Sequence, residues 1–245
     1  MTTVAISQPM YFPWLGMFEQ INIADVLVHY DDVQMPLGRT FMSRVQLKTA
    51  NGVRWLTVPI RRKSGQPINE VEIDETMPWR RSHIGLLGEA FRNARYGIDA
   101  VRIAKDVLDS GDRSLSHLTI RSTDAVCAYL GLTRRSVIAS DLAAQGRGTQ
   151  RLIDLLRKLD AKRYVTGHGA ADYLDHPAME KHGIAVSYID YAKRPYDQGD
   201  GAFTPYVTAL DAIAHLGKEA RHLLVSSTTP WRDFIASRGS NSNRS

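Results

Sequence analysis

The residue types best suited to chemistry gather in two short segments near the start of the chain. The first, QPMYFPWLG, runs from Gln8 to Gly16 and puts an amide, three aromatic rings and two prolines directly after a short apolar run. Because proline restricts the backbone, we expect a stiff loop that holds Gln8, Tyr11 and Trp14 as the wall of a substrate-binding pocket. The same rings could instead close one end of the hydrophobic core.

The second segment, HYDDVQ, follows the apolar run VLV. Side chains two apart on a strand face the same side, so His29 and Asp31 could act as a histidine oriented by an acid, or as two ligands of one metal ion. We expect His29, Asp31 and Asp32 to supply a general base or to bind substrate hydroxyl groups without a metal or cofactor, and Gln34 to contact substrate. Paired aspartates at a strand end also often cap a turn.

Further along the chain, three cations follow in close succession: Arg39, Arg44 and Lys48. Guanidinium and ammonium groups suit phosphate or carboxylate oxygens, so these side chains could clamp an anionic part of a substrate. The alternative is a surface hairpin whose charges form salt bridges.

Two later segments are glycine-containing loops that could border the same site. In TGHGAADYL, Gly167 permits close backbone approach to a ligand beside His168, although the dinucleotide fingerprint GxGxxG is absent because position 172 is Asp172. The loop YAKRPYDQGDGAF could fold over a site as a lid, with Tyr196 and Gln198 as polar contacts. Both segments could equally be ordinary turns or surface loops.

The elements that must position these residues alternate between strand and helix patterns. We predict an α/β fold with a mostly parallel sheet, made of a βαβ start, an inserted hairpin and helical middle, and a βαβαβ-like final third. The predicted elements are the strand VAIS, the helix LGMFEQINIA, the strand VLVHYDDV, a hairpin over 45–59 turning at Asn51 and Gly52, a strand over 67–73, helices over 79–131 ending at Gly131, the strand SVIA, a helix over 149–159, the strand RYVTG, a helix over ADYLDHPAMEKH and the strand IAVSYIDY.

Length and composition limit the classes of protein. The 245 residues, 43% of them hydrophobic and 23% charged, favour one globular domain over residues 1–237 with a flexible tail at 238–245. The net charge of +5 suits an anionic small-molecule substrate, but the basic residues are scattered, which argues against nucleic acid binding. With Cys127 as its one cysteine the chain forms no internal disulfide, and we expect a cytoplasmic protein without a leader or membrane span, whose oligomeric state the sequence leaves open.

Taken together, five segments of the sequence resemble the WbqC-like family. The resemblance runs from Ile6 to about Gly217 and departs from the family at ASDL near Ser140 and at Thr208, where serine is commoner. The segments are QPMYFPWLGMFEQINIADVLVHYDDVQ, RVQLKTANGVRWLTVPI, YVTGHGAADYLD, PYDQ and FTPYVTALDAI.

The resemblance implies a setting in the biosynthesis of O-antigen, lipopolysaccharide or other surface glycans, or of natural products such as antibiotics. In that setting we expect a transferase that moves an acyl or aminoacyl group from an activated donor, such as a carrier-protein thioester, to an amino group of a sugar or aminocyclitol. Two alternatives remain: a nucleotidyl or glycosyl transfer enzyme that uses a nucleotide donor, and a non-catalytic binding protein of a biosynthetic assembly.

Overall fold

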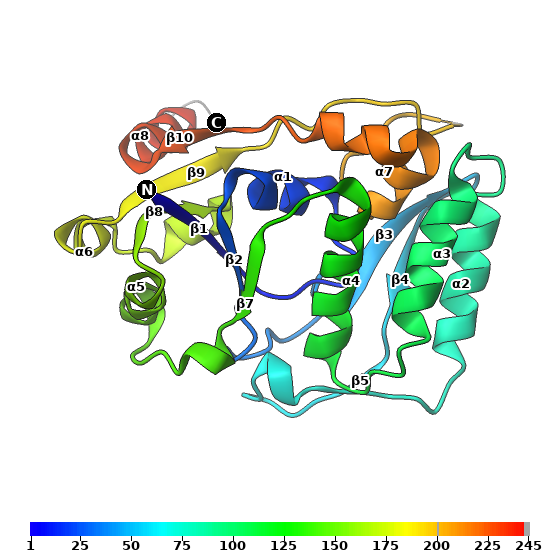
Figure 1. Ribbon diagram of the computed structural model, residues 1–245, viewed down its shortest axis with the longest axis horizontal. Helices are drawn as coiled ribbons and strands as arrows, with labels where there is room; N and C mark the ends of the chain where they lie inside the picture. Colours follow the sequence, from blue (N-terminus) through cyan, green and yellow to red (C-terminus); the bar gives the residue numbers. More distant parts are fainter. Residues whose placement is uncertain (200, 243–245) are drawn as a thin grey trace.

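The centre of the molecule is a six-stranded sheet (Figure 1). The computed structural model describes residues 1–199 and 201–242. The strands follow the order β10-β9-β8-β1-β2-β7, and only β10 runs antiparallel to its neighbour, so the predicted α/β class with a mostly parallel sheet is confirmed. These strands are β1 (Thr2–Ser7), β2 (Val26–His29), β7 (Arg135–Ile138), β8 (Ala161–Thr166), β9 (Ala185–Asp190) and β10 (Ser227–Pro230).

The two faces of the sheet belong to different hydrophobic clusters. Side chains alternate along β1, so Val4 and Ile6 pack on one face while Ala5 packs on the other. The Val4 face is covered by α5 (Gly148–Lys158) and α6 (His176–Lys181), and the Ala5 face by α1 (Leu15–Ile23) and α4 (Leu115–Leu130) (Figure 1). Both clusters therefore bury the parallel strands on both sides, as a doubly wound sheet requires.

The chain between β2 and β7 forms the inserted region predicted from the sequence. The predicted hairpin is present, but the two residues between the paired Thr49 and Gly52 are Ala50 and Asn51, and Gly52, at φ +96°, begins the second strand. Its helices occupy the predicted helical middle, and the last of them ends at Gly131, which adopts φ +67°. The elements of this region are β3 (Arg44–Thr49), β4 (Gly52–Thr57), β5 (Ile60–Arg61), η1 (Ile68–Glu70), β6 (Glu72–Ile73), α2 (Trp79–Ala90), α3 (Gly97–Leu108) and α4.

The strand predicted over 67–73 is wrong for most of its length. Residues 68–70 form the 3-10 helix η1, and only Glu72 and Ile73 form a strand. The backbone N–H groups of Ile68 and Asn69 donate to the carbonyls of Val33 and Asp31. Because these donors are satisfied by the segment after β2, no longer strand pairing is needed.

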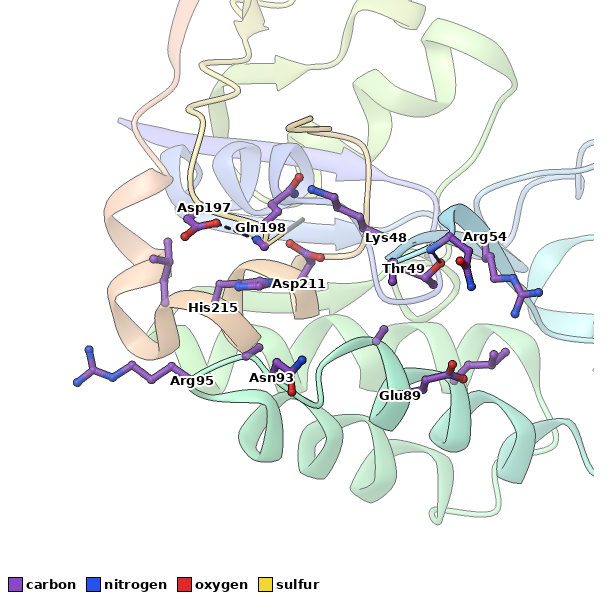
Figure 2. A pocket seen from close by; sticks show the side chains of 17 residues that line it. Lys48, Thr49, Arg54, Glu89, Asn93, Arg95, Asp197, Gln198, Asp211 and His215 are labelled. Carbon is purple, nitrogen blue, oxygen red and sulfur yellow. Dashed lines mark hydrogen bonds between the residues drawn. The ribbon is translucent and has the colours of Figure 1, made fainter. Parts of the chain in front are cut away.

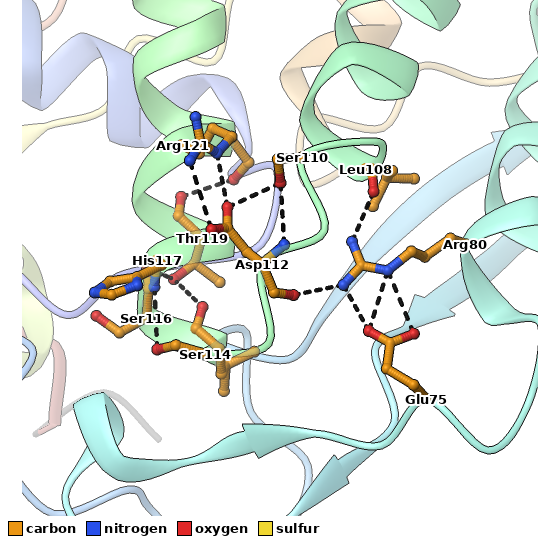
Figure 3. A network of polar contacts seen from close by, with 12 residues as sticks. Glu75, Arg80, Leu108, Ser110, Asp112, Ser114, Ser116, His117, Thr119 and Arg121 are labelled. Atoms are coloured by element: carbon orange, nitrogen blue, oxygen red, sulfur yellow. Dashed lines mark hydrogen bonds and ion pairs between the residues drawn. The ribbon is translucent and has the colours of Figure 1, made fainter.

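A polar network ties the start of α2 to the ends of the neighbouring helices (Figure 3). The Arg80 guanidinium donates to the Glu75 carboxylate and to the backbone carbonyls of Leu108 and Asp112, while the Asp112 side chain accepts from Arg121 on α4. Three helices are thereby joined at one corner of the molecule.

In the last third, one predicted helix is divided. The segment expected as a single helix over 171–182 is the 3-10 helix η3 (His168–Asp172) followed by α6. The Asp175 side chain accepts from the Ala178 N–H, and Pro177 in the first turn has no N–H with which to continue a preceding helix. The second helix, α6, therefore begins at an N-cap of its own and does not continue η3.

The remaining elements close the molecule. They include β10 and α8, which the sequence patterns did not predict; α8 takes in the first residues of the predicted flexible tail, and residues 243–245 lie outside the described part. None of the described helices is long and apolar enough to cross a membrane. These elements are η2 (Ser140–Leu142), α7 (Ala209–Leu216), η4 (Gly217–Leu223) and α8 (Trp231–Ser242).

Candidate functional site

The carboxyl ends of β1 and β8 mark the point where the strand order reverses, which is a common ligand position in such sheets. The loop after β1 carries Trp14, whose ring centroid lies 4.9 Å from that of Tyr191. The loop after β8 carries His168, whose ring lies 5.5 Å from the same tyrosine, and a Cβ at Gly167 would lie 3.1 Å from its hydroxyl. Two predicted site segments thus meet around Tyr191.

The other members of the first predicted loop have different surroundings. Gln8 is half-buried after β1. Tyr11 is fully buried, and its hydroxyl is paired with His83 Nδ1 at 2.9 Å. Burial raises the pKa of Tyr11. Tyr11 is therefore part of the core, as in the alternative reading of this loop, and its hydroxyl is already occupied.

The predicted histidine and aspartate of the second segment take separate partners. His29 is only 1% exposed, and its Nε2 lies 2.9 Å from the Ser136 hydroxyl on β7. Burial lowers the pKa of His29 to about 4, although the nearby Asp31 charge opposes the shift. Asp31 is also buried and accepts from the backbone N–H and the hydroxyl of Ser140 at 3.0 and 2.8 Å. His29 is thus not oriented by Asp31, and the aspartate caps a turn.

The rest of that segment also makes structural contacts. Asp32 forms an ion pair with Arg151 on α5, and Gln34 forms an isolated β-bridge with Pro67. Among the described residues, no group of three or more histidine, cysteine, aspartate or glutamate side chains is placed to hold a metal ion.

The three predicted cations have different neighbours. Arg39 is exposed, and the Arg44 guanidinium stacks over the Trp55 ring at 3.8 Å. Lys48 lies further along β3 and lines a different pocket. The three side chains thus have different surroundings, and their joint role as a clamp stays a prediction.

A pocket with a volume of about 520 Å³ lies beyond the end of the β3–β4 hairpin (Figure 2). The hairpin, the end of α2 with the loop after it, α7 and the loop after β9 all contribute to its wall. This volume suits a small molecule. Its ionisable lining side chains are Lys48, Arg54, Glu89, Arg95, Asp197, Asp211 and His215.

Asp211 is the most unusual of these groups because it is 1% exposed, in the first turn of an apolar helix. The Tyr196 hydroxyl donates to Asp211 Oδ1 at 2.8 Å, and Gln198 Nε2 donates to the Tyr196 oxygen at 3.0 Å. Burial raises the pKa of Asp211, while the Tyr196 hydrogen bond and the charges of His215 and Lys48 oppose the shift.

The predicted loop residues Tyr196 and Gln198 therefore hold Asp211 in place. Gln198 also pins its own loop, because its side-chain amide donates to the Thr204 carbonyl and accepts from the Thr204 N–H. Burial raises the pKa of Tyr196, which keeps its hydroxyl a donor at neutral pH. The result is a carboxylate fixed at the wall of a polar pocket.

Sequence reasoning missed Asp211 and the other residues that α2 and α7 bring to the pocket. One signal was present: an acidic residue inside the apolar run VTALDAIA, four residues before His215. No such signal marked Glu89, Asn93 or Arg95, because nothing in the helical pattern shows which neighbour a polar helix end will face.

Two comparisons with known proteins find relatives of this chain. The model of the family described as WbqC-like protein family matches residues 8–223. The uncharacterized protein Rv1507c of Mycobacterium tuberculosis is 34% identical over 224 residues, which cover 90% of this chain and 96% of that protein. No solved structure matches the chain.

Proposed function

The chain belongs to the WbqC-like protein family, and we propose that it is a transferase that forms an amide. In this proposal it moves an acyl or aminoacyl group from a thioester-like donor, such as one on a carrier protein, to an amino group of a sugar or aminocyclitol. The observation that carries the proposal is Asp211, a buried carboxyl group with a raised pKa at the wall of a 520 Å³ polar pocket.

Asp211 suits the role of general base. Transfer to an amine requires that the nitrogen lose a proton as it bonds to carbon, and a carboxylate becomes a stronger base as its pKa rises toward neutrality. The Tyr196 and Gln198 hydrogen bonds fix its orientation before substrate arrives.

The proposed step balances without a further reactant. The amine nitrogen attacks the carbonyl carbon, a C–N bond forms, and the proton lost from nitrogen passes to Asp211. The C–S bond then breaks, and the departing thiolate takes the proton from Asp211. The carboxylate is regenerated for the next turnover.

The mixed charge of the pocket supports the same substrate class. Asp197 and Glu89 offer carboxylates to an ammonium group, while Lys48 and Arg54 offer cations to an anionic part of the donor or acceptor. This arrangement moves the proposed base from His29 or Asp31 to Asp211, since neither His29 nor Asp31 lines the pocket.

The test is amide formation by the purified protein. Carrier-bound acyl and aminoacyl thioesters are incubated with amino sugars and aminocyclitols, and amide products are measured by mass spectrometry. We expect Asp211→Asn to lower kcat at least about 100-fold, the usual scale of a lost general base.

Asp106→Asn, a change at an exposed position on α3, serves as the matched control and should leave turnover unchanged. Absence of amide product with all donor and acceptor pairs would exclude the proposed reaction. Equal turnover in wild type and Asp211→Asn would exclude the proposed base.

A further inference from the structure

The outer face of the β3–β4 hairpin is exposed and carries side chains that the proposed reaction does not use. The register places Gln46 opposite Trp55, and side chains alternate between the two faces along each strand. The inner face packs into the core through Val45, Leu47 and Leu56. The side chains of the outer face are Arg44, Gln46, Lys48, Val53, Trp55 and Thr57.

Two further aromatic rings border this outer face. Phe41, just before β3, is 52% exposed, and its ring centroid lies 6.0 Å from that of Trp55. Tyr206, in the loop before α7, is 48% exposed, and its hydroxyl accepts a hydrogen bond from Lys193 Nζ at 3.0 Å. We define the docking face as Phe41, Arg44, Lys48, Val53, Trp55, Lys193 and Tyr206.

The docking face is filled and offers no cavity. The hollow between Phe41, Arg44 and Tyr206 has a volume of only about 10 Å³, and the Arg44 guanidinium covers the Trp55 ring at 3.8 Å. A small molecule needs an enclosing pocket, which this surface lacks. Exposed aromatic groups on a filled surface are instead typical of contacts with another macromolecule, and aromatic residues and arginine are enriched in protein interfaces.

The charge of this part of the chain has one sign. The segment 33–69, which contains the hairpin, has seven arginine and lysine residues and no aspartate or glutamate. The other 24 basic residues stand against all 26 acidic ones, so the positive excess of the protein lies in this segment. Arg44, Lys48 and Lys193 form no ion pair with a described carboxylate. An acidic partner would complement this charge.

The docking face adjoins the candidate active site. Lys48 belongs to the face by its register on β3, and it also lines the 520 Å³ pocket that contains Asp211. Thr49 and Asn51, at the turn of the same hairpin, line that pocket too. A partner seated on the outer face would therefore lie beside the pocket.

We propose that the docking face binds an acidic carrier-protein domain, which presents the thioester of the proposed reaction to the pocket. The identity of the partner rests on the proposed function, and the place of contact rests on the basic and aromatic side chains. Carboxylates of the carrier pair with Arg44 and Lys48, and an apolar side chain of the carrier packs on Trp55.

An anionic membrane surface would share the charge of such a partner. The stack of Arg44 on Trp55 favours the protein, because a guanidinium held in one orientation donates to carboxylates at defined positions and leaves less bare ring to enter lipid. Vesicles therefore serve as a comparison in the test.

The test measures binding of two purified acidic carriers, an acyl carrier protein and a peptidyl carrier domain, by fluorescence anisotropy. Each carries its phosphopantetheine arm without an acyl group. We expect saturable binding of at least one carrier, weakened at least about tenfold when the salt concentration rises from about 50 to about 500 mM. Vesicles of phosphatidylglycerol should not bind the protein.

Variants assign the binding to the docking face. Arg44→Ala and Trp55→Ala should each weaken carrier binding at least about tenfold, with circular dichroism showing that each variant is folded. Two changes at exposed positions outside the face, Arg157→Gln on α5 and Ile98→Ala on α3, should leave the affinity unchanged.

The inference and the proposed reaction can fail separately. Asp211→Asn should bind the carrier as wild type does, and Trp55→Ala should keep wild-type turnover with a small N-acetylcysteamine thioester, which needs no docking. Carrier binding without amide formation from any donor would remove the reaction alone. Amide formation from the small thioester without carrier binding would remove the docking face alone.

Three results would overturn the inference. The first is the absence of saturable binding by both carriers. The second is an unchanged carrier affinity in both Arg44→Ala and Trp55→Ala, which would place the contact elsewhere. The third is binding to phosphatidylglycerol vesicles but to neither carrier, which would make the face a membrane contact.

Discussion

At the scale of single residues, two buried histidines are the clearest electrostatic feature. His29 faces Ser136, and His83 faces the Tyr11 hydroxyl. Burial lowers the pKa of each to about 4, from an ordinary value of 6.5. Both side chains are consequently neutral at physiological pH and act as packing and hydrogen-bonding groups.

His29 should make the fold sensitive to acid. Below pH 6.5 the unfolded chain binds a proton that the folded chain resists down to about pH 4, so the free energy of unfolding falls as the pH falls through this window. Between pH 7 and pH 4.5, the free energy of unfolding measured in urea should fall by about 2 to 3 kcal/mol less in His29→Gln than in wild type. His222→Gln, at an exposed position, should behave like wild type.

Asp211 should set the acid limb of the reaction. The base works only as a carboxylate, and burial raises its pKa, so kcat should decrease as the pH drops below that raised value. A rate profile whose acid limb lies at the ordinary pKa of an aspartate would contradict the role of burial at this site.

At the scale of elements, the helix that carries Asp211 is fixed by its cap. Thr208 Oγ1 accepts from the Leu210 N–H at the start of α7, and Thr208 is buried. A serine at this position would carry the same hydroxyl. The acceptor of the cap therefore does not depend on the threonine methyl group.

The cap can be tested by two substitutions. Thr208→Ala should lower the free energy of unfolding by about 1 kcal/mol and reduce turnover, because α7 positions Asp211. Thr208→Ser should retain most of both. Equal losses in the two variants would show that the methyl group, and not the hydroxyl, is what matters.

The Arg80 hydrogen-bond network is a second feature that fixes helices relative to one another (Figure 3). Arg80→Ala removes the donors to two backbone carbonyls and the Glu75 carboxylate, which should cost about 2 to 3 kcal/mol in chemical unfolding. The adjacent Arg81→Ala, at an exposed position, should stay within about 0.5 kcal/mol of wild type. A similar loss in both would contradict the role of the network, because alanine favours a helix at least as well as arginine does.

At the scale of the whole molecule, the sheet could be predicted and the pocket could not. Parallel strands buried on both faces leave continuous apolar runs such as VAIS and VLV, and the hairpin carries its own Asn-Gly turn signal. The pocket is assembled from residues 48–54, 86–95, 197–199 and 211–216. Their proximity depends on how the inserted region packs against α7, which local patterns do not encode.

The predicted site residues illustrate the same limit. The polar residues after β2 were predicted to act in catalysis or substrate binding. In the fold they contact neighbouring segments, as Asp31 does by accepting a hydrogen bond from Ser140. Lys48, Tyr196 and Gln198 were recognised by type, but only the fold brings them to Asp211. Residue type identified candidate site residues, but long-range packing determines which of them lie near Asp211.

The most direct test of the proposed site compares kcat for amide formation in Asp211→Asn and His29→Gln, both verified as folded at pH 7. We expect kcat to fall at least about 100-fold in Asp211→Asn and to remain within a few-fold of the wild-type value in His29→Gln. A large loss in His29→Gln with normal turnover in Asp211→Asn would return the chemistry to the end of β2 and contradict the assignment of the 520 Å³ pocket as the active site.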